Sequence, residues 1–260
     1  MTTKHQFNRQ KGDKIEWSQW TWNPIVGCKG PDEKGPCIYC YARDSYNYRM
    51  KDERYGGKPF TEPTFHVERL DAPKNTRLPP NPNDRHVFVC SMSDLFGASI
   101  PQDQIDYVLQ AIWDSPEWTY ILLTKNPKRL VGIDFPQNAW VGTTVDIQAR
   151  VAPAQEAFKS VKATVRFLSC EPLQEVVTFS DLSMFNWMII GGRSENSVLP
   201  AFKPPQPWID GLVRDARSAG LKVYQKPNLG VDEATRLREY PAAKAYTTRD
   251  VFDFDSPRSP

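Results

Sequence analysis

Residues 86–123 read HVFVCSMSDLFGASIPQDQIDYVLQAIWDSPEWTYILL, and this stretch decides the fold class. Its two ends, residues 86–90 and 119–123, are short apolar runs, which predict strands buried on both faces. Between them, residues 102–114 follow a proline and place their apolar side chains on one helical stripe. A strand, a helix and a second strand in this order are typical of a parallel sheet in an α/β protein.

The same alternation continues outward from this unit. Further strands are expected at 139–142, 164–168, 187–190 and 221–224, with an earlier one within 17–25, and further helices at 37–50, 147–158 and 208–219. Six or seven units without a dinucleotide-type glycine signature favour an α/β fold built as a full or partial (β/α) barrel. An open doubly wound sheet is the second interpretation.

The rest of the chain suggests one domain with an arm, a loop and a tail. We expect an N-terminal arm at 1–16, a single catalytic domain at 17–246 and a flexible, polar tail at 247–260. Residues 52–84 are polar and rich in proline, which predicts a long loop. Basic residues in the arm suggest a local nucleic-acid patch, and the alternative is a solvated arm. These residues are Lys4, Arg9, Lys11 and Lys14.

The composition predicts a globular protein outside the membrane. The chain has 260 residues, of which 40% are hydrophobic and 25% charged, and no apolar run approaches the ~20 residues that span a bilayer. The first residues lack the apolar stretch of a secretory signal, so we expect a cytoplasmic protein. The net charge of +2 is not that of a protein that binds nucleic acid through many phosphates. The sequence predicts no oligomeric state.

Three of the five cysteines, Cys28, Cys37 and Cys40, fall within one short segment. An odd number of cysteines without an export signal argues against a disulfide framework and favours a metal. A structural zinc site normally has four protein ligands. A [4Fe–4S] cluster on three thiolates leaves one iron open, and S-adenosylmethionine can bind there. The alternative is a Cys3His zinc site completed by one of the three histidines, and the spacing does not choose. The candidates are His5, His66 and His86.

Several longer motifs surround the cysteines. They are TWNPIVGC at 21–28, CIYCYAR at 37–43, PTFHVERLD at 63–71, SMSDLFG at 91–97, LLTKNPKRL at 122–130, WVGTTV at 140–145, LSCEPL at 168–173, IIGGRS at 189–194 and REYP at 238–241. In this order they resemble a three-Cys-motif family of phages and bacteria that is related to the radical S-adenosylmethionine enzymes. The first cysteine gap is longer than the C-x3-C-x2-C of the broad superfamily.

The resemblance implies a function, cofactors and partners. It implies a barrel of the radical S-adenosylmethionine type, a [4Fe–4S] cluster on Cys28, Cys37 and Cys40, and S-adenosyl-L-methionine as the source of a 5′-deoxyadenosyl radical. A reductant protein such as flavodoxin or ferredoxin would supply the electron. Phage relatives imply DNA as substrate, for example isomerisation or hypermodification of a modified thymine in a bacterial or phage-infected host cell.

Polar residues follow the predicted strands, where (β/α) barrels place their sites. The resemblance implies that Tyr39 packs near the adenine, and the alternative is ordinary packing. The other candidates to bind the cofactor are hydroxyls, carboxylates and glycines, for which helix capping, turns and close packing are the structural alternatives. They are Ser91, Ser93, Asp94, Thr143, Glu171, Gly191 and Gly192.

Three residues are candidates for catalysis. Cys90 and Cys170 end two predicted strands, so a thiol could donate a hydrogen atom to a substrate radical, and the alternative is two buried thiols. Lys125 follows another strand and could hold a carboxylate or phosphate, and the alternative is a surface lysine. Gln225 and Lys226 are weaker candidates of the same kind.

Three classes of function remain after this reading. The first is the radical enzyme. The second is a zinc-stabilised nucleic-acid-binding module without catalysis. The third is a different radical reaction on a peptide or small molecule. The metal that the cysteines hold separates the second class from the other two.

Overall fold

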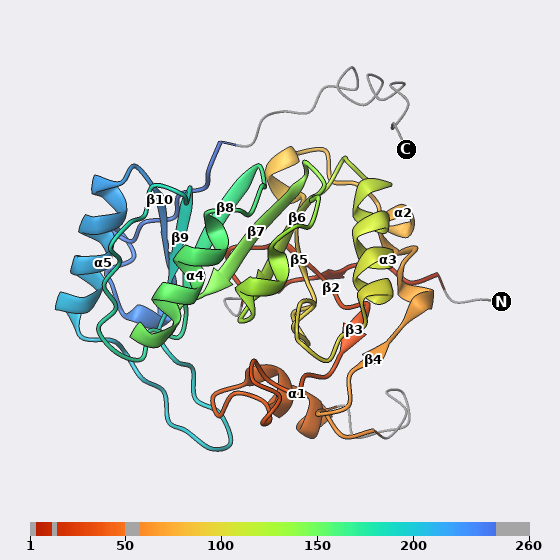
Figure 1. Cartoon of the computed structure of the whole chain (residues 1–260), viewed down its shortest axis with the longest axis horizontal. Coiled ribbons are helices and arrows are strands. Elements are labelled where there is room, and N and C mark those ends of the chain that lie inside the picture. The colour runs from red at the N-terminus through yellow and green to blue at the C-terminus, as the bar shows by residue number, and fades with distance from the viewer. Residues whose placement is uncertain (1–3, 12–14, 50–57, 243–260) are drawn as a thin grey trace.

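The computed structural model describes residues 4–11, 15–49 and 58–242 and contains one large, mostly parallel sheet (Figure 1). Its strand order is β1-β2-β5-β6-β7-β8-β9-β10. Only β1 runs antiparallel to its neighbour. The strands are β1 (Asn8–Arg9), β2 (Trp20–Trp22), β5 (His86–Val89), β6 (Thr119–Thr124), β7 (Ala139–Thr144), β8 (Val165–Cys170), β9 (Trp187–Ile190) and β10 (Lys222–Gln225). The predicted α/β class and its strands are confirmed.

The order of the strands follows the chain from β2 to β10 without a reversal. A doubly wound sheet reverses its order at a switch point, so the second interpretation is not supported. The sheet does not close, because β1 and β10 are not paired within the described residues. The expectation of a full barrel is therefore wrong for this part of the chain.

A side-chain ion pair links the segment before β2 to the segment after β10. Residues 237–239 run along the outer edge of β10, where the Gln225 N–H donates to the Leu237 carbonyl at 2.8 Å and Tyr224 forms a bridge with Arg238. Next to them, Arg236 donates to the Glu16 carboxylate, which precedes β2, at 2.6 and 2.8 Å. The guanidinium holds the pKa of Glu16 below its ordinary value. The two segments are thus joined through Arg236 and Glu16.

The helices α3 (Gln102–Trp113), α4 (Val151–Phe158) and α5 (Gln206–Ser218) confirm three of the predicted helices. They cover one face of the large sheet (Figure 1). The predicted helix at 37–50 is shorter, since α1 spans Tyr41–Arg49 and the two preceding cysteines lie in the turn before it. No helix among the described residues is both long and apolar enough to cross a membrane.

Two sequence expectations about loops are corrected. The N-terminal arm is not solvated throughout, because β1 pairs with β2 and Phe7 is buried against Trp22 and Trp118. Lys4, Arg9 and Lys11 are exposed, whereas Lys14 lies outside the described residues. From residue 58 on, the predicted loop at 52–84 contains short elements. They are β4 (Thr64–Phe65), α2 (Ala72–Asn75) and 3-10 turns at Val67–Arg69 and Pro82–Asp84. The tail at 247–260 is outside the described residues.

A second, two-stranded sheet was not predicted. It pairs β3 (Ile25–Val26) with β4, so the segment before Cys28 is joined to the former loop region. Each strand has only two residues, which is too short for a periodic signal in the sequence. Figure 1 shows β3, β4 and α1 grouped at one end of the large sheet.

The two faces of the large sheet carry different cores. The larger, mainly aliphatic cluster packs against the helices. The other face carries an aromatic cluster, which we call the inner-face cluster and which is fully or almost fully buried. Its aromatic members are Trp17, Phe88, Trp140, Phe167, Trp187 and Tyr224. Successive residues of a strand point to opposite faces, so each strand contributes to both cores.

Candidate functional site

The segment that carries Cys28 is attached to the end of β5. The Gly27 N–H donates to the Met92 carbonyl at 3.0 Å, and the Gly27 carbonyl accepts from the Ser93 hydroxyl at 2.6 Å. The Cys28 N–H donates to the Phe60 carbonyl at 2.7 Å. The cysteine is therefore held from two sides, by the residues after β5 and by those before β4.

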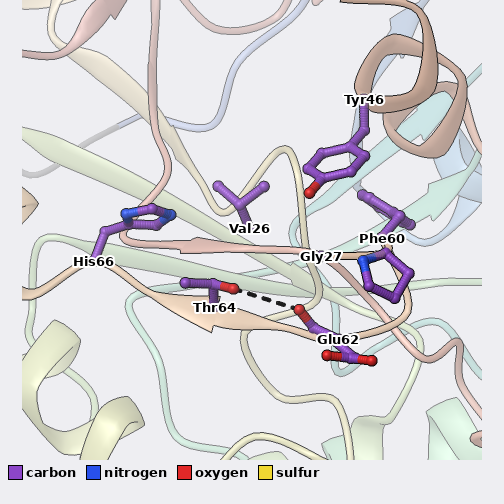
Figure 2. Close-up of a pocket in the computed structure, with 8 residues that line it drawn as sticks. Val26, Gly27, Tyr46, Phe60, Glu62, Thr64 and His66 are labelled. Atoms are coloured by element: carbon purple, nitrogen blue, oxygen red, sulfur yellow. Dashed lines mark hydrogen bonds between the residues drawn. The ribbon is translucent and has the colours of Figure 1, made fainter. Parts of the chain in front are cut away.

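Gly27 has no room for a side chain. Its φ is +101°, and a Cβ there would lie 2.8 Å from the Phe60 carbonyl oxygen. Figure 2 shows Gly27 beside the rings of Tyr46 and Phe60 and across from Glu62 and Thr64. Glycine supplies the positive φ and lets the backbone approach this closely.

A small apolar cluster lies beneath the cysteines. Val26, Ala42, Tyr46 and Phe60 are buried together. Cys28 and Cys40 both pack against this cluster, although twelve positions of sequence separate them. The fold thus brings the first and third cysteines to one apolar base, which their spacing alone did not establish.

All three cysteines are free and half-buried. The Gly30 N–H donates to Cys28 Sγ at 3.2 Å, and the Arg43 N–H donates to Cys40 Sγ at 3.4 Å. Burial raises the pKa of the Cys28 thiol to about 12, and the neighbouring Asp94, Cys40 and Cys37 add to this. Burial also raises the pKa of Cys40. A bound metal would offset this cost, because it stabilises the thiolates directly.

The donor chemistry fits a sulfur-bound metal group. Within the described ranges, no three His, Cys, Asp or Glu side chains are positioned as a ready-made metal site. Even so, three free thiols lie on one segment within electrostatic reach of one another, and backbone N–H groups point at two of the sulfurs. Such N–H groups are what tune thiolate-bound iron.

Asp94 and its neighbours join the ends of β5 and β6. The Asp94 carboxylate accepts from the Lys125 N–H at 2.9 Å and from the Phe96 N–H at 3.1 Å. Burial raises its pKa. Thr143 is fully buried, and its hydroxyl donates to the Thr124 carbonyl at 2.9 Å. These contacts give Asp94 and Thr143 structural roles at the strand ends.

Ser91 also has its hydrogen bonds within the fold. Its hydroxyl donates to Asn23 Oδ1 at 3.1 Å, and the Met92 N–H donates to the same oxygen at 2.9 Å. The Ser91 carbonyl accepts from the Tyr41 hydroxyl at 2.5 Å. Asn23 and Tyr41 belong to the cysteine-bearing region, so Ser91 and Ser93 both attach that region to β5.

Glu171 and Lys226 form an ion pair at the ends of β8 and β10, with side chains 20% and 8% exposed. A Cβ at Gly191 would lie 2.9 Å from Glu171 Cγ, so glycine makes room for this pair. Gly192 exchanges two hydrogen bonds with the Asn228 side chain. Lys226, a weaker candidate from the sequence, is thereby placed next to two of the stronger ones, Glu171 and Gly191.

Tyr39 connects the cysteine turn to a residue that the sequence reading missed. Its hydroxyl donates to the carboxylate of Asp146, which is 1% exposed and follows β7. Arg150 Nε lies 2.6 Å from the other carboxylate oxygen, and Lys125 Nζ lies 5.5 Å from the Tyr39 ring centroid. Burial and the Asp146 charge raise the pKa of Tyr39. Asp146 is a carboxylate just after a predicted strand, as Glu171 is, so the same sequence pattern predicts it as a candidate.

The two remaining cysteines lie in the core. Cys90 and Cys170 are buried in the larger, helix-side cluster, and burial raises the pKa of the Cys90 thiol to about 12 and that of Cys170 as well. Cys90 has a φ of +56° just after β5. The structure thus places both thiols beneath the strand ends and away from solvent.

The histidines lie in different places. His86 begins β5, at the opposite end of that strand from Cys90, and its Nδ1 lies 3.0 Å from the Asn83 carbonyl oxygen. This position does not suit the fourth ligand of a zinc site on the cysteines. His66 lines the same hollow as Gly27, and Val26 lies between them in Figure 2; its Nδ1 is 3.0 Å from Glu68 Oε1. His5 is half-buried in the arm.

The loop after β9 reaches the cysteine segment. The Ser197 hydroxyl donates to Asp44 Oδ1 at 2.9 Å, and the Asn196 side-chain amide donates to the Ile38 carbonyl at 2.9 Å. Ile38 lies between Cys37 and Tyr39. The turn of Cys37 and Cys40 is therefore also held by this loop.

A family described as "Protein of unknown function (DUF5131)" matches residues 12–246 of this sequence. The chain belongs to this family. The DUF5131 region includes the three clustered cysteines, the small sheet and every strand of the large sheet except β1. No curated protein and no solved structure matches the chain.

Proposed function

We propose that the protein is a radical S-adenosylmethionine enzyme that holds a [4Fe–4S] cluster on Cys28, Cys37 and Cys40. The observation that carries this proposal is the attachment of the cysteine segment to the ends of parallel strands. Cys28 is fixed through Gly27 to the residues after β5, and Tyr39 is bonded to Asp146 after β7. Ligand sites of (β/α) proteins lie at these strand ends.

The finer fold proposal is a partial (β/α) barrel of the radical S-adenosylmethionine type. Seven parallel strands in chain order, β2 and β5 to β10, support it. Such a sheet gathers the segments after its strands at one end, so residues far apart in sequence contribute to one site.

When bound, the cluster supplies an electron that cleaves a carbon–sulfur bond of S-adenosylmethionine to give a 5′-deoxyadenosyl radical. The chain's own residues would bind and orient the ligand. Glu171 offers a carboxylate to an amino group or to ribose hydroxyls, and Lys226 holds that carboxylate in place. Lys125 carries a positive charge beside Tyr39, where it would attract a carboxylate or phosphate. The loop bonded to Asp44 and Ile38 helps to hold the turn of Cys37 and Cys40 in position.

The proposed substrate is a modified thymine base in DNA, in the cytoplasm of a bacterial or phage-infected host cell. The proposed reductant is a protein such as flavodoxin or ferredoxin. A reducing compartment also keeps the five free cysteines as thiols. To test the substrate, DNA that carries a modified thymine is incubated with the reduced enzyme and its nucleosides are analysed. Conversion of a peptide instead of the DNA would favour the third class of function.

The first experiment measures the metal and the cleavage reaction. Protein purified without oxygen is assayed for iron, sulfide and zinc, then reduced with dithionite and examined by electron paramagnetic resonance with and without S-adenosylmethionine. We expect a [4Fe–4S]⁺ signal that changes on addition of S-adenosylmethionine, and formation of 5′-deoxyadenosine. Stoichiometric zinc without iron or sulfide would overturn the proposal and favour the nucleic-acid-binding module.

A further inference from the structure

Asp146 is a buried carboxylate with a fixed backbone. The preceding Val145 N–H donates to the Ser169 carbonyl at 2.9 Å, and the Asp146 carbonyl accepts from the Gln174 N–H at 3.0 Å. Both partners belong to β8 or to the segment after it. The residue therefore sits on a rigid part of the large sheet, and its side chain is 2% exposed.

A carboxylate this deeply buried needs a compensating partner, because an unpaired buried charge is costly. Arg150 provides it, with its Nε 2.6 Å from Oδ1, four residues further along the chain. The second oxygen, Oδ2, accepts from the Tyr39 hydroxyl. A hydrogen bond to an ionised acceptor is stronger than one between neutral groups. Oδ1 of Asp146 thus faces the positive charge of Arg150, and Oδ2 is hydrogen-bonded to Tyr39 of the cysteine segment.

We infer that Asp146 is a positioning residue that tethers the turn of Cys37 and Cys40 to the carboxyl end of β7 through the Tyr39 hydroxyl. Tyr39 lies between these two cysteines in the chain, so a bond that fixes its side chain also restrains the backbone of their turn. Lys125 contacts the ring of Tyr39 and restricts it further. The role in holding a cluster rests on the proposed function, whereas the tether itself does not.

Cys28 provides an internal control, because other contacts fix it. Its N–H is bonded to Phe60, and Gly27 is bonded to Met92 and Ser93. None of these partners involves Tyr39 or Asp146. Loss of the tether should therefore release Cys37 and Cys40 while Cys28 stays in place.

The test measures the reactivity of each cysteine in the full-length, metal-free protein. Iodoacetamide is added to the reduced protein, and mass spectrometry follows the alkylation of each thiol with time. In Tyr39→Phe and Asp146→Ala, we expect Cys37 and Cys40 to react about three- to tenfold faster than in the wild type, as the loss of one hydrogen bond predicts. Cys28 should change by less than about twofold.

Two further variants make the result specific. Tyr120→Phe also removes a buried phenol hydroxyl, which is 2.7 Å from the Ser115 hydroxyl near the start of β6, and it should leave all three rates unchanged. Asp146→Asn keeps an acceptor for Tyr39 but loses the charge that attracts Arg150, so it should lie between wild type and Asp146→Ala. The double variant Tyr39→Phe/Asp146→Ala should match Asp146→Ala, since both changes remove the same bond. Unchanged rates at Cys37 and Cys40 in folded Tyr39→Phe would overturn the tether.

The cluster gives a second readout that separates the two proposals. If the wild type takes up iron and sulfide, the electron paramagnetic resonance signal of reduced Tyr39→Phe should differ from that of the wild type, because the second and third ligands are displaced. An identical signal would contradict a role in positioning the cluster. If the wild type takes up no iron, the proposed function fails, and the alkylation rates still decide whether the tether exists.

Discussion

The inner-face cluster and the carboxyl end of the sheet lie on the same strands but differ in composition. Trp140 and Trp187 are buried in the inner-face cluster, with ring centroids 5.6 Å apart. Beyond the ends of β7, β8 and β9, the chain instead carries Asp146, Glu171 and Gly191. Each strand thus contributes stability along its length and polar side chains just after it ends.

The physical basis of this division is the hydrogen bonding of the backbone. Within a strand, the ladder satisfies the peptide groups, and the side chains are free to pack as apolar layers. After the strand ends, side chains and backbone must find other partners. Asp94, which accepts from two backbone N–H groups, and Ser93, which donates to a carbonyl, illustrate this. Polar residues are therefore tolerated there, and ligands can use them.

The largest expected effect concerns the metal. If the proposed cluster is present, Cys28→Ala should reduce the iron content from about four per chain to background, because two thiolates do not hold the cluster. The change should cost little stability, since the side chain is only half-buried. Anaerobic purification followed by iron and sulfide assays checks this. Cys170→Ala, a change in the core, is the control and should keep its iron. Loss of iron in both variants would contradict the claim that the clustered cysteines, and not the core, hold the metal.

A substitution in the inner-face cluster should lower the stability of the protein and leave its iron content unchanged. Trp187→Ala removes a fully buried ring that packs against Trp140, Phe167 and Tyr240, so the free energy of unfolding should fall by about 3–5 kcal/mol. Urea denaturation measures this change. Iron per folded chain should stay at the wild-type level. Val131→Ala, at a 48% exposed position, should unfold as the wild type does.

Gly27→Ala should affect both stability and the site. The new Cβ would lie 2.8 Å from the Phe60 carbonyl oxygen at a φ of +101°, and we expect a loss of about 1–3 kcal/mol in the free energy of unfolding, with lower iron uptake. The matched control is Gly220→Ala, where φ is +79° and the new methyl group would have no other atom within 4 Å. This control should lose less stability and keep its iron. Equal losses of iron in the two variants would contradict a specific role for Gly27.

The smallest expected effect is a pH dependence at the other end of the sheet. Burial lowers the pKa of His86 from its ordinary value of 6.5, so the folded protein prefers the neutral ring. Below pH 6.5, the unfolded chain therefore binds more protons than the folded protein. The stability that the neutral His86 ring contributes is fully present above pH 6.5, and it is lost as the pH falls through the folded-state pKa. Urea denaturation at pH 7.5 and 5.5 should show a smaller decrease for His86→Gln than for the wild type. Equal decreases would show that His86 does not contribute to the pH dependence of the free energy of unfolding.

Much of the large sheet could be predicted, because buried parallel strands leave continuous apolar runs such as residues 119–123 and 187–190. The small sheet could not, since two-residue strands leave no periodic pattern. The pairing of the N-terminal arm with the sheet is hard to predict for a similar reason: Phe7 alone marks its burial, and one apolar residue in a polar segment carries little signal. The clustering of the three cysteines is visible in the sequence, whereas their attachment to the end of β5 depends on hydrogen bonds of Gly27 that only the fold provides.

The α/β class, the cluster of three cysteines and the residues that follow each strand can be predicted without a structure, because they depend on local pattern and on residue type. Three features depend instead on the folded arrangement: the sheet is open within the described residues, Cys28 and Cys40 share one apolar base, and Tyr39 meets Asp146 across 107 positions of sequence. Contacts over such distances arise when packing brings strand ends together. No local pattern encodes them, because the partners are chosen by the arrangement of the whole sheet.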